Sequence, residues 1–198
     1  MALAVENLAC RRGGRLIFEG LSFRLAQGEA IALTGRNGAG KSSLIALVCG
    51  RLRPEAGSVR IEGAGDTPAP ELIHLIGHRD GLKSALGAAG NLAFAQAVLG
   101  EPALSAAAAL DMVGLPHVAD VPVGYLSAGQ RRRVALARLL VSRRPFWLLD
   151  EPMAALDFAA QAMVAGLMQA HLDAGGAILA ATHGPLGLAG ARELRIGP

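Results

Sequence analysis

The segment from Gly35 to Ser42 limits the fold of this chain more than any other stretch. It follows an apolar run, Ala30 to Thr34, that is typical of a buried strand, and it leads into Ser43 to Cys49, which is typical of the first turns of a helix. A glycine-rich turn between a strand and a helix points several backbone N–H groups at one spot, where the helix N-terminus adds its own free donors and dipole. The spacing G-x-x-x-x-G-K-[ST] lets Lys41 reach β- and γ-phosphates and lets the Ser42 hydroxyl hold Mg²⁺.

We therefore expect a nucleotide site at this turn. The alternative is a chance match in a chain with 26 glycines, and the strand before and the helix after the turn count against it. The residues expected to contact the nucleotide are Gly35, Arg36, Asn37, Gly38, Ala39, Gly40, Lys41, Ser42 and Ser43.

Composition and charge exclude several classes. With 198 residues the chain is expected to form one domain, spanning 1–198. The net charge of +3 comes without a lysine- or arginine-rich tail, so no nucleic-acid partner is expected. Cys10 and Cys49 are isolated and read as reduced thiols of a cytosolic protein. Neither a secretory signal nor a membrane span is expected, since glycines break the longest uncharged runs.

Strand and helix patterns alternate along most of the chain, which indicates an α/β protein with a mostly parallel sheet covered on both faces. Residues 1–30 contain two strand patterns separated by a Gly13-Gly14 turn, so we expect an antiparallel β layer there. Further strands are expected at Ala30–Thr34, Ser58–Glu62, Leu72–Ile76, Phe146–Leu149, Ala177–Ala181 and Glu193–Ile196. Helices are expected from Ser43 to about Arg51, across Ser84–Val113 with glycine breaks at 87, 90 and 100, and at Arg131–Ser142 and Phe158–Leu172.

Two carboxylates stand at the end of the expected strand Phe146–Leu149. Asp150 can hold the coordination shell of Mg²⁺, and Glu151 can act as general base on an attacking water. Two solvated acids at a strand end would be the alternative. The phosphate-binding turn earlier in the same α/β chain favours the catalytic interpretation.

Leu126-Ser127-Ala128-Gly129-Gln130 opens a helix and forms a second anion-binding helix end through Ser127 and Gly129. With this segment the chain resembles the ATP-binding subunits of ABC transporters over nearly its whole length. The resemblance implies a P-loop NTPase (RecA-like) core, an inserted helical subdomain at about 82–142, and two copies that enclose two ATP molecules. It also implies that Ser127 and Gly129 reach the other copy's ATP, and that residues 153–157 contact the other protomer.

The same resemblance implies the remaining site residues. Glu151 and His183 would be catalytic, with His183 sensing the γ-phosphate, although a lone histidine is more often structural. Arg12 falls where the family has an aromatic side chain that stacks on adenine, and a guanidinium can also stack on a base. His78 falls where the family has a glutamine. We therefore expect Mg²⁺ to be held by Ser42, Asp150 and His78, and His78 to couple to a membrane subunit.

Within that family the chain resembles the haem-exporter ATPases of cytochrome c maturation. The resemblance lies in His74–His78, Gly81–Lys83, Asn91-Leu92, Leu126–Ala135 and Pro145–Pro152, whereas Asp80 and Gly90 depart from it. It implies the membrane partners CcmB, CcmC and CcmD, and a place on the cytoplasmic face of the bacterial inner membrane. The work would be haem export or release of a haem-loaded chaperone.

Three alternatives stay open: an ABC ATPase for another cargo, a non-transport member acting on DNA or the ribosome, and a regulatory subunit with low turnover. The retained Glu151 and His183 count against the last. The arginines around the helix, at 131, 132, 133, 138, 143 and 144, are interpreted as a solvated face, with an acidic partner as the alternative. Tyr125 and Trp147 are interpreted as packing residues.

Overall fold

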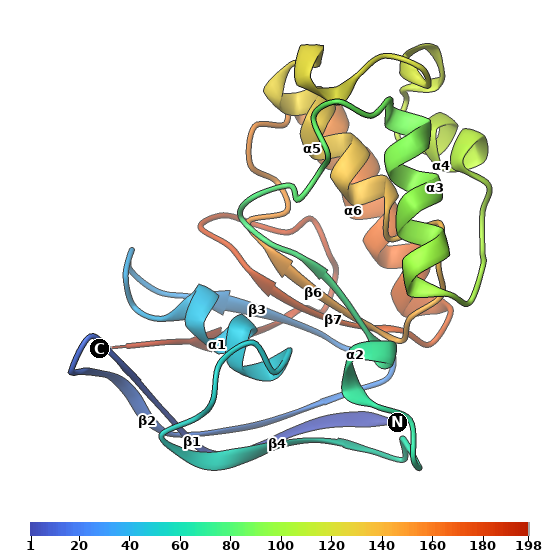
Figure 1. Cartoon of the computed structure of the whole chain (residues 1–198). Coiled ribbons are helices and arrows are strands. Elements are labelled where there is room, and N and C mark those ends of the chain that lie inside the picture. The colour runs from blue at the N-terminus through green and yellow to red at the C-terminus, as the bar shows by residue number, and fades with distance from the viewer. Residues whose placement is uncertain (198) are drawn as a thin grey trace.

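A five-stranded sheet forms the centre of the computed structural model, which describes residues 1–197 (Figure 1). Its strands lie in the order β5–β6–β7–β3–β8, and every neighbouring pair is parallel. Their bounds are Ile73–Ile76 (β5), Phe146–Asp150 (β6), Ala177–Ala181 (β7), Ala30–Thr34 (β3) and Arg192–Arg195 (β8). The predicted parallel α/β core is confirmed.

The central strands are buried on both faces, as parallel strands between two helical layers are. Side chains alternate along β6: Phe146 and Leu148 join one hydrophobic cluster, while Trp147 and Leu149 join another on the opposite face. Because the carboxyl ends of parallel strands meet at one edge, β3, β6 and β7 deliver the residues that follow them to one place.

A three-stranded antiparallel sheet, β2–β1–β4, packs beneath the first sheet. β1 (Ala2–Arg12) and β2 (Arg15–Ala26) form a hairpin whose turn, Gly13-Gly14, has φ values of 54° and 78°. The predicted antiparallel layer of residues 1–30 thus exists, and β4 (Ala56–Glu62) extends it from outside that range.

Helix α1 (Lys41–Val48) lies between the two sheets (Figure 1). Its buried residues Leu44, Ile45, Leu47 and Val48 belong to the cluster that contains side chains of both sheets. Helix α6 (Phe158–Asp173) covers the other face of the parallel sheet through Val164, Met168 and Leu172. A short helix, α2 (Ala69–Leu72), leads into β5.

The helical insertion contains α3 (Ala88–Leu99), α4 (Ala106–Met112), two 3₁₀ turns (Pro116–Val118 and Val123–Tyr125) and α5 (Ala128–Ala137). These helices pack around a cluster of their own that includes Leu92, Leu110 and Val134. The helix expected at Arg131–Ser142 begins three residues earlier, since Ser127 caps it, and it ends at Ala137. Gly90, expected to break a helix, lies inside α3. Within residues 1–197, no helix combines the length and the apolar character that a membrane crossing requires.

Candidate functional site

The turn between β3 and α1 places the ammonium group of Lys41 over its own backbone. Lys41 is the first residue of α1 and is 7% exposed. Its Nζ donates to the carbonyl oxygens of Gly35, at 2.8 Å, and Arg36, at 3.4 Å. The turn therefore curls around the lysine, and the free N–H groups of the helix N-terminus open beside it.

Two glycines of the turn sit where no side chain fits. At Gly40 (φ 109°) a Cβ would lie 2.5 Å from Cγ2 of Ile17 and 3.1 Å from the ring of Phe18. At Gly35 (φ 135°) it would lie 2.4 Å from the carbonyl oxygen of Ile196. The turn is pressed between β2 and the C-terminal segment, so its shape is fixed by both.

The carboxyl end of β6 carries the two acids. Asp150 is its last residue and is 7% exposed. Glu151 follows with φ 52°, in the left-handed region that side chains other than glycine seldom adopt, and its N–H donates to the carbonyl oxygen of Ala181 at 2.9 Å. In this backbone conformation the chain leaves the direction of β6 at Glu151, and the hydrogen bond to Ala181 fixes this point to the end of β7.

His183 contacts both Lys41 and Glu151. Its Nε2 lies 3.3 Å from Oε1 of Glu151 and 3.4 Å from Nζ of Lys41. Just before it, the hydroxyl of Thr182 donates to the carbonyl oxygen of Gly184 and accepts from the N–H of Gly184, which forms a tight turn after β7. One imidazole nitrogen cannot donate to Glu151 and accept from Lys41 at the same time, so its protonation selects the partner.

These groups line one open cavity of about 630 Å³. Two cations, two carboxylates, two histidines and backbone donors surround it, a set suited to an anionic ligand whose charge changes during reaction. The lining residues are Arg12, Ile17, Asn37, Gly38, Gly40, Lys41, Ser42, Ser43, His78, Asp150, Glu151 and His183. Ile17, which sequence reasoning missed, faces this cavity from β2.

The oxygen atoms of Ser42 and Asp150 suit Mg²⁺, a hard cation that keeps several waters and takes one or two carboxylates. Among the described residues, no group of three or more histidine, cysteine or acidic side chains is arranged so that it could hold a metal ion by itself. His78 lines the same cavity, but its imidazole nitrogen is a poorer donor for Mg²⁺ than an oxygen.

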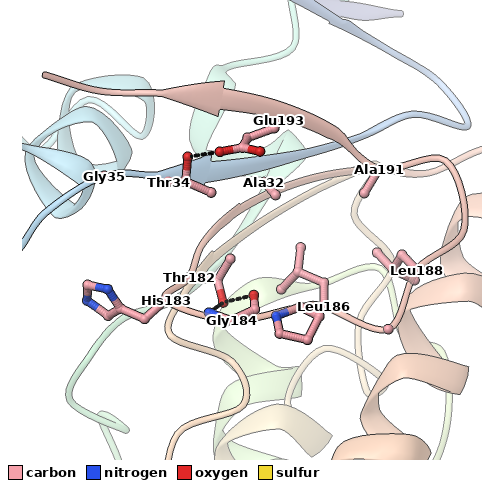
Figure 2. Close-up of a pocket in the computed structure, with 12 residues that line it drawn as sticks. Ala32, Thr34, Gly35, Thr182, His183, Gly184, Leu186, Leu188, Ala191 and Glu193 are labelled. Carbon is pink, nitrogen blue, oxygen red and sulfur yellow. Dashed lines mark hydrogen bonds between the residues drawn. The ribbon is translucent and has the colours of Figure 1, made fainter. Parts of the chain in front are cut away.

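Three of the expected phosphate contacts face neighbouring cavities. Arg36 and Ala39 line one of about 390 Å³ that also includes Asn37 and Gly38. Gly35 lines another, of about 480 Å³, between β3 and the segment after β7 (Figure 2). His183 lies at one end of this second cavity, and the hydrogen bond from Thr34 to Glu193 crosses its upper wall in Figure 2.

Ser127 and Gly129 do not line the cavity that contains Lys41. Ser127 caps α5: its hydroxyl accepts from the N–H of Gln130 at 3.2 Å, and the Gln130 side chain accepts from the N–H of Ser127 at 2.9 Å. At Gly129 a Cβ would lie 2.9 Å from the carbonyl oxygen of Ala155. The start of α5 therefore rests on the loop after Glu151.

Of the two aromatic residues interpreted as packing residues, one is buried and the other is exposed. Trp147 is buried and stacks on His171, with ring centroids 3.9 Å apart and an interplanar angle of 8°. Its packing role is confirmed. Tyr125 is 86% exposed, so its interpretation as a packing residue is wrong. The segment before Ser127 turns this ring away from the core, because the apolar neighbour Leu126 fills the buried position.

The arginines were expected on a solvated face, and for several of them this is wrong. Arg132 and Arg144 are 3% and 7% exposed, and Arg138 is half-buried. Their guanidinium groups donate to backbone carbonyls of other segments, which compensates for burial. Burial lowers the pKa of Arg138 and of Arg144 below the ordinary arginine value. Arg143 is exposed, as expected.

Comparison with known proteins agrees with this geometry. The ABC transporter family model matches residues 18–154. The cytochrome c biogenesis ATP-binding export protein CcmA of Rhodopseudomonas palustris (strain HaA2) is 55% identical over 198 residues, which cover 100% of this chain and 98% of the relative. CcmA of Chelativorans sp. (strain BNC1) is 52% identical over 199 residues, with the same coverage.

Among solved structures, a bacterial ABC transporter cassette determined as a dimer matches with a TM-score of 0.85 and 22% identity. The match covers 98% of this chain and 94% of that one. The same cassette in a post-hydrolysis state with ADP and Pi matches with a TM-score of 0.84 at the same identity and coverage. At this identity the likeness shows the fold, and the family follows from the sequence relatives. The chain belongs to the CcmA group of the ABC transporter ATP-binding family.

Proposed function

We propose that this transport ATPase hydrolyses ATP to power haem export, or release of a haem-loaded chaperone, during biogenesis of c-type cytochromes. The observation that carries the hydrolytic part is the single cavity in which Lys41, Glu151 and His183 meet. The assignment to haem and cytochrome c rests on relatives that match the whole chain and are named for cytochrome c biogenesis and export.

Each residue of the cavity has a role in that reaction. Lys41 and the N–H groups around it hold the β- and γ-phosphates. Glu151 takes a proton from the water that attacks the γ-phosphorus as the bond to the β-phosphate oxygen breaks. His183, in contact with Glu151, hydrogen-bonds the γ-phosphate and reports its presence. Arg12, at the rim, stacks on the base. When bound through Ser42 and Asp150, Mg²⁺ neutralises charge on the phosphates.

A second copy of the chain completes the site in this proposal. The N-terminus of α5 offers an anion-binding end that does not line the chain's own Lys41 cavity, so in this proposal Ser127 and Gly129 serve the nucleotide of the partner. The exposed Tyr125 lies next to that end, on the surface that the second copy would cover. A related cassette was solved as a dimer.

The proposed setting is the cytoplasmic face of the bacterial inner membrane, with CcmB, CcmC and CcmD as partners. The helical insertion exposes apolar side chains on α3, among them Phe94 at 49% and Val98 at 66%. Such side chains suit contact with a membrane subunit. Another cargo is the second candidate, because none of the described residues identifies the cargo; co-purification of the membrane subunit distinguishes the two.

The decisive variant is Glu151→Gln. It keeps the size of the side chain and removes the base, so hydrolysis falls to background while ATP still binds. The variant then accumulates as an ATP-dependent dimer, measured by light scattering on the membrane complex and on the full-length chain. Hydrolysis that persists in Glu151→Gln, or a variant that stays monomeric in saturating ATP within the membrane complex, contradicts the proposal.

A further inference from the structure

Arg132 is a buried cation at the centre of a hydrogen-bond network. It lies on α5, and its side chain is 4% exposed. A buried charge is tolerated only when its polar atoms are paired. The two terminal nitrogens of its guanidinium make four hydrogen bonds to two separate segments, whereas Nε is without a partner among residues 1–197.

Two of these bonds reach the catalytic end of β6. Nη2 of Arg132 donates to the carbonyl oxygens of Asp150, at 2.7 Å, and Glu151, at 2.8 Å. Glu151 has the left-handed backbone conformation, which persists only where its surroundings hold it. The N–H of Ala154 also donates to the Glu151 carbonyl, at 3.1 Å. The direction of the Glu151 side chain therefore depends on a backbone that Arg132 helps to fix.

The other two bonds reach the loop that follows β5. Nη1 of Arg132 donates to the carbonyl oxygen of Gly77, at 2.9 Å, and to Oδ1 of Asp80, at 3.1 Å. A second arginine of this region, Arg138, donates to the carbonyl oxygen of Asp80 at 3.1 Å. The loop contains His78, which lines the nucleotide cavity. One guanidinium thus joins this loop directly to the backbone of the proposed base.

We propose that Arg132 is a positioning residue and that Asp80 acts through it on Glu151. The proposal rests on the function proposed above, because it assigns Glu151 the role of base. The planar fork of arginine is essential here, since two nitrogens bond two segments at once; the single ammonium of lysine cannot reproduce that geometry. A displacement of the Gly77–Asp80 loop is transmitted to the carboxylate through a single side chain.

Kinetics of the full-length chain test the proposal. Asp80→Ala lowers kcat about tenfold and leaves the KM for ATP within about twofold, because the base is displaced while the phosphate turn is intact. Asp80→Asn restores part of kcat, because its amide oxygen still accepts from Nη1. Arg132→Lys lowers kcat further, by about 30- to 100-fold. Adding Asp80→Ala to Arg132→Lys lowers kcat by no more than about a further twofold, because Asp80 acts on Glu151 only through Arg132.

Arg133→Lys is the matched control. Arg133 neighbours Arg132 on α5, but its Nη1 donates to the carbonyl oxygens of Val113, at 3.1 Å, and Gly114, at 3.5 Å, inside the helical insertion. The kcat and KM of Arg133→Lys stay within about twofold of the wild-type values. If Arg132→Lys does not fold, the variants Asp80→Ala and Asp80→Asn alone test the proposal.

A second readout is independent of turnover. Amide hydrogen exchange at residues 150–154 becomes about tenfold faster in Asp80→Ala, while exchange at residues 30–34 in β3 is unchanged. Unchanged kcat together with unchanged exchange at 150–154 overturns the proposal, and so does a loss confined to thermal stability or to KM. If instead Glu151→Gln leaves hydrolysis intact, the proposed function fails, and exchange at 150–154 still decides whether Asp80 positions this segment.

Discussion

Nε2 of His183 lies 3.3 Å from Oε1 of Glu151, so the second residue after β7 and the first residue after β6 meet across the edge of the parallel sheet. The contact holds the carboxylate toward the phosphate turn. Since Nε2 also lies 3.4 Å from Nζ of Lys41, the histidine lies between the proposed base and the ammonium group proposed to bind phosphate.

Replacing His183 with alanine removes this contact and leaves the phosphate turn intact. We expect kcat to fall by about 100-fold, with a much smaller change in ATP affinity. Phosphate release and equilibrium ATP binding measure the two effects. The control is His117→Ala, because His117 is an exposed residue of the first 3₁₀ turn in the helical insertion. Equal losses of affinity and kcat would argue against a role for His183 in the chemical step.

Arg12→Ala tests the base-stacking assignment. Arg12 ends β1 and lines the nucleotide cavity. We expect the KM for ATP to rise about three- to tenfold with kcat nearly unchanged, because only uniform binding is lost. Its neighbour Arg11 provides the control, since Arg11 forms an exposed ion pair with Glu55 at 3.4 Å. A KM equal to that of the wild type removes Arg12 from the base site.

Ser127 has a structural and a proposed functional role, and two variants separate them. Ser127→Ala and Gln130→Ala each break one half of the capping box, and each is expected to cost about 1 kcal/mol of stability. Only Ser127→Ala removes a hydroxyl from the shared site, so only it should sharply reduce ATP-dependent dimerisation and hydrolysis. Urea unfolding, light scattering and phosphate release give the three values. If dimerisation and hydrolysis fall equally in both variants, Ser127 acts only as the cap of α5.

One buried histidine, His74, and one partly buried histidine, His171, make stability depend on pH. Burial lowers the pKa of His74 and of His171 from 6.5 to about 4. The unfolded chain therefore binds more protons between these values, and stability is full above pH 6.5 and is lost as the pH falls toward 4. Each histidine contributes a slope of at most about 1.4 kcal/mol per pH unit.

Urea unfolding at pH 7, 6 and 5 measures this slope. His171→Phe keeps an aromatic ring against Trp147 and removes the titrating group, so its stability should fall less steeply toward acid. If the curves of the variant and the wild type run parallel, His171 does not titrate between these pH values in the way its burial implies.

Much of the core could be predicted because its signals are local. Ala30–Thr34 and Ala177–Ala181 are short apolar runs bounded by turns, and both strands lie where expected. The Gly35–Ser42 turn and the two acids lie at the carboxyl ends of such strands, so their convergence at one edge also follows from the sequence. The start of α5 could also be predicted from the sequence, since Ser127 and Gln130 have the spacing of a capping box.

The environment of Arg132 could not be predicted in the same way. Three consecutive arginines on a helix resemble a solvated face, and burial of the middle one depends on carbonyl groups at positions 77, 150 and 151. Those partners are far away in the chain and are backbone atoms, which leave no mark in the side-chain pattern. The same holds for β4, whose pairing with β1 depends on where α1 returns the chain.

The helical insertion has a core of its own, whereas α1 is fixed in the cluster shared by both sheets. Two cores in one chain need not melt together. Calorimetry should then give a measured unfolding enthalpy larger than the van 't Hoff value, because the insertion loses its packing in a separate step. Nucleotide that joins the phosphate turn to a partner's α5 would merge the two steps, and a single sharper transition would report that the halves of the molecule had become one cooperative unit.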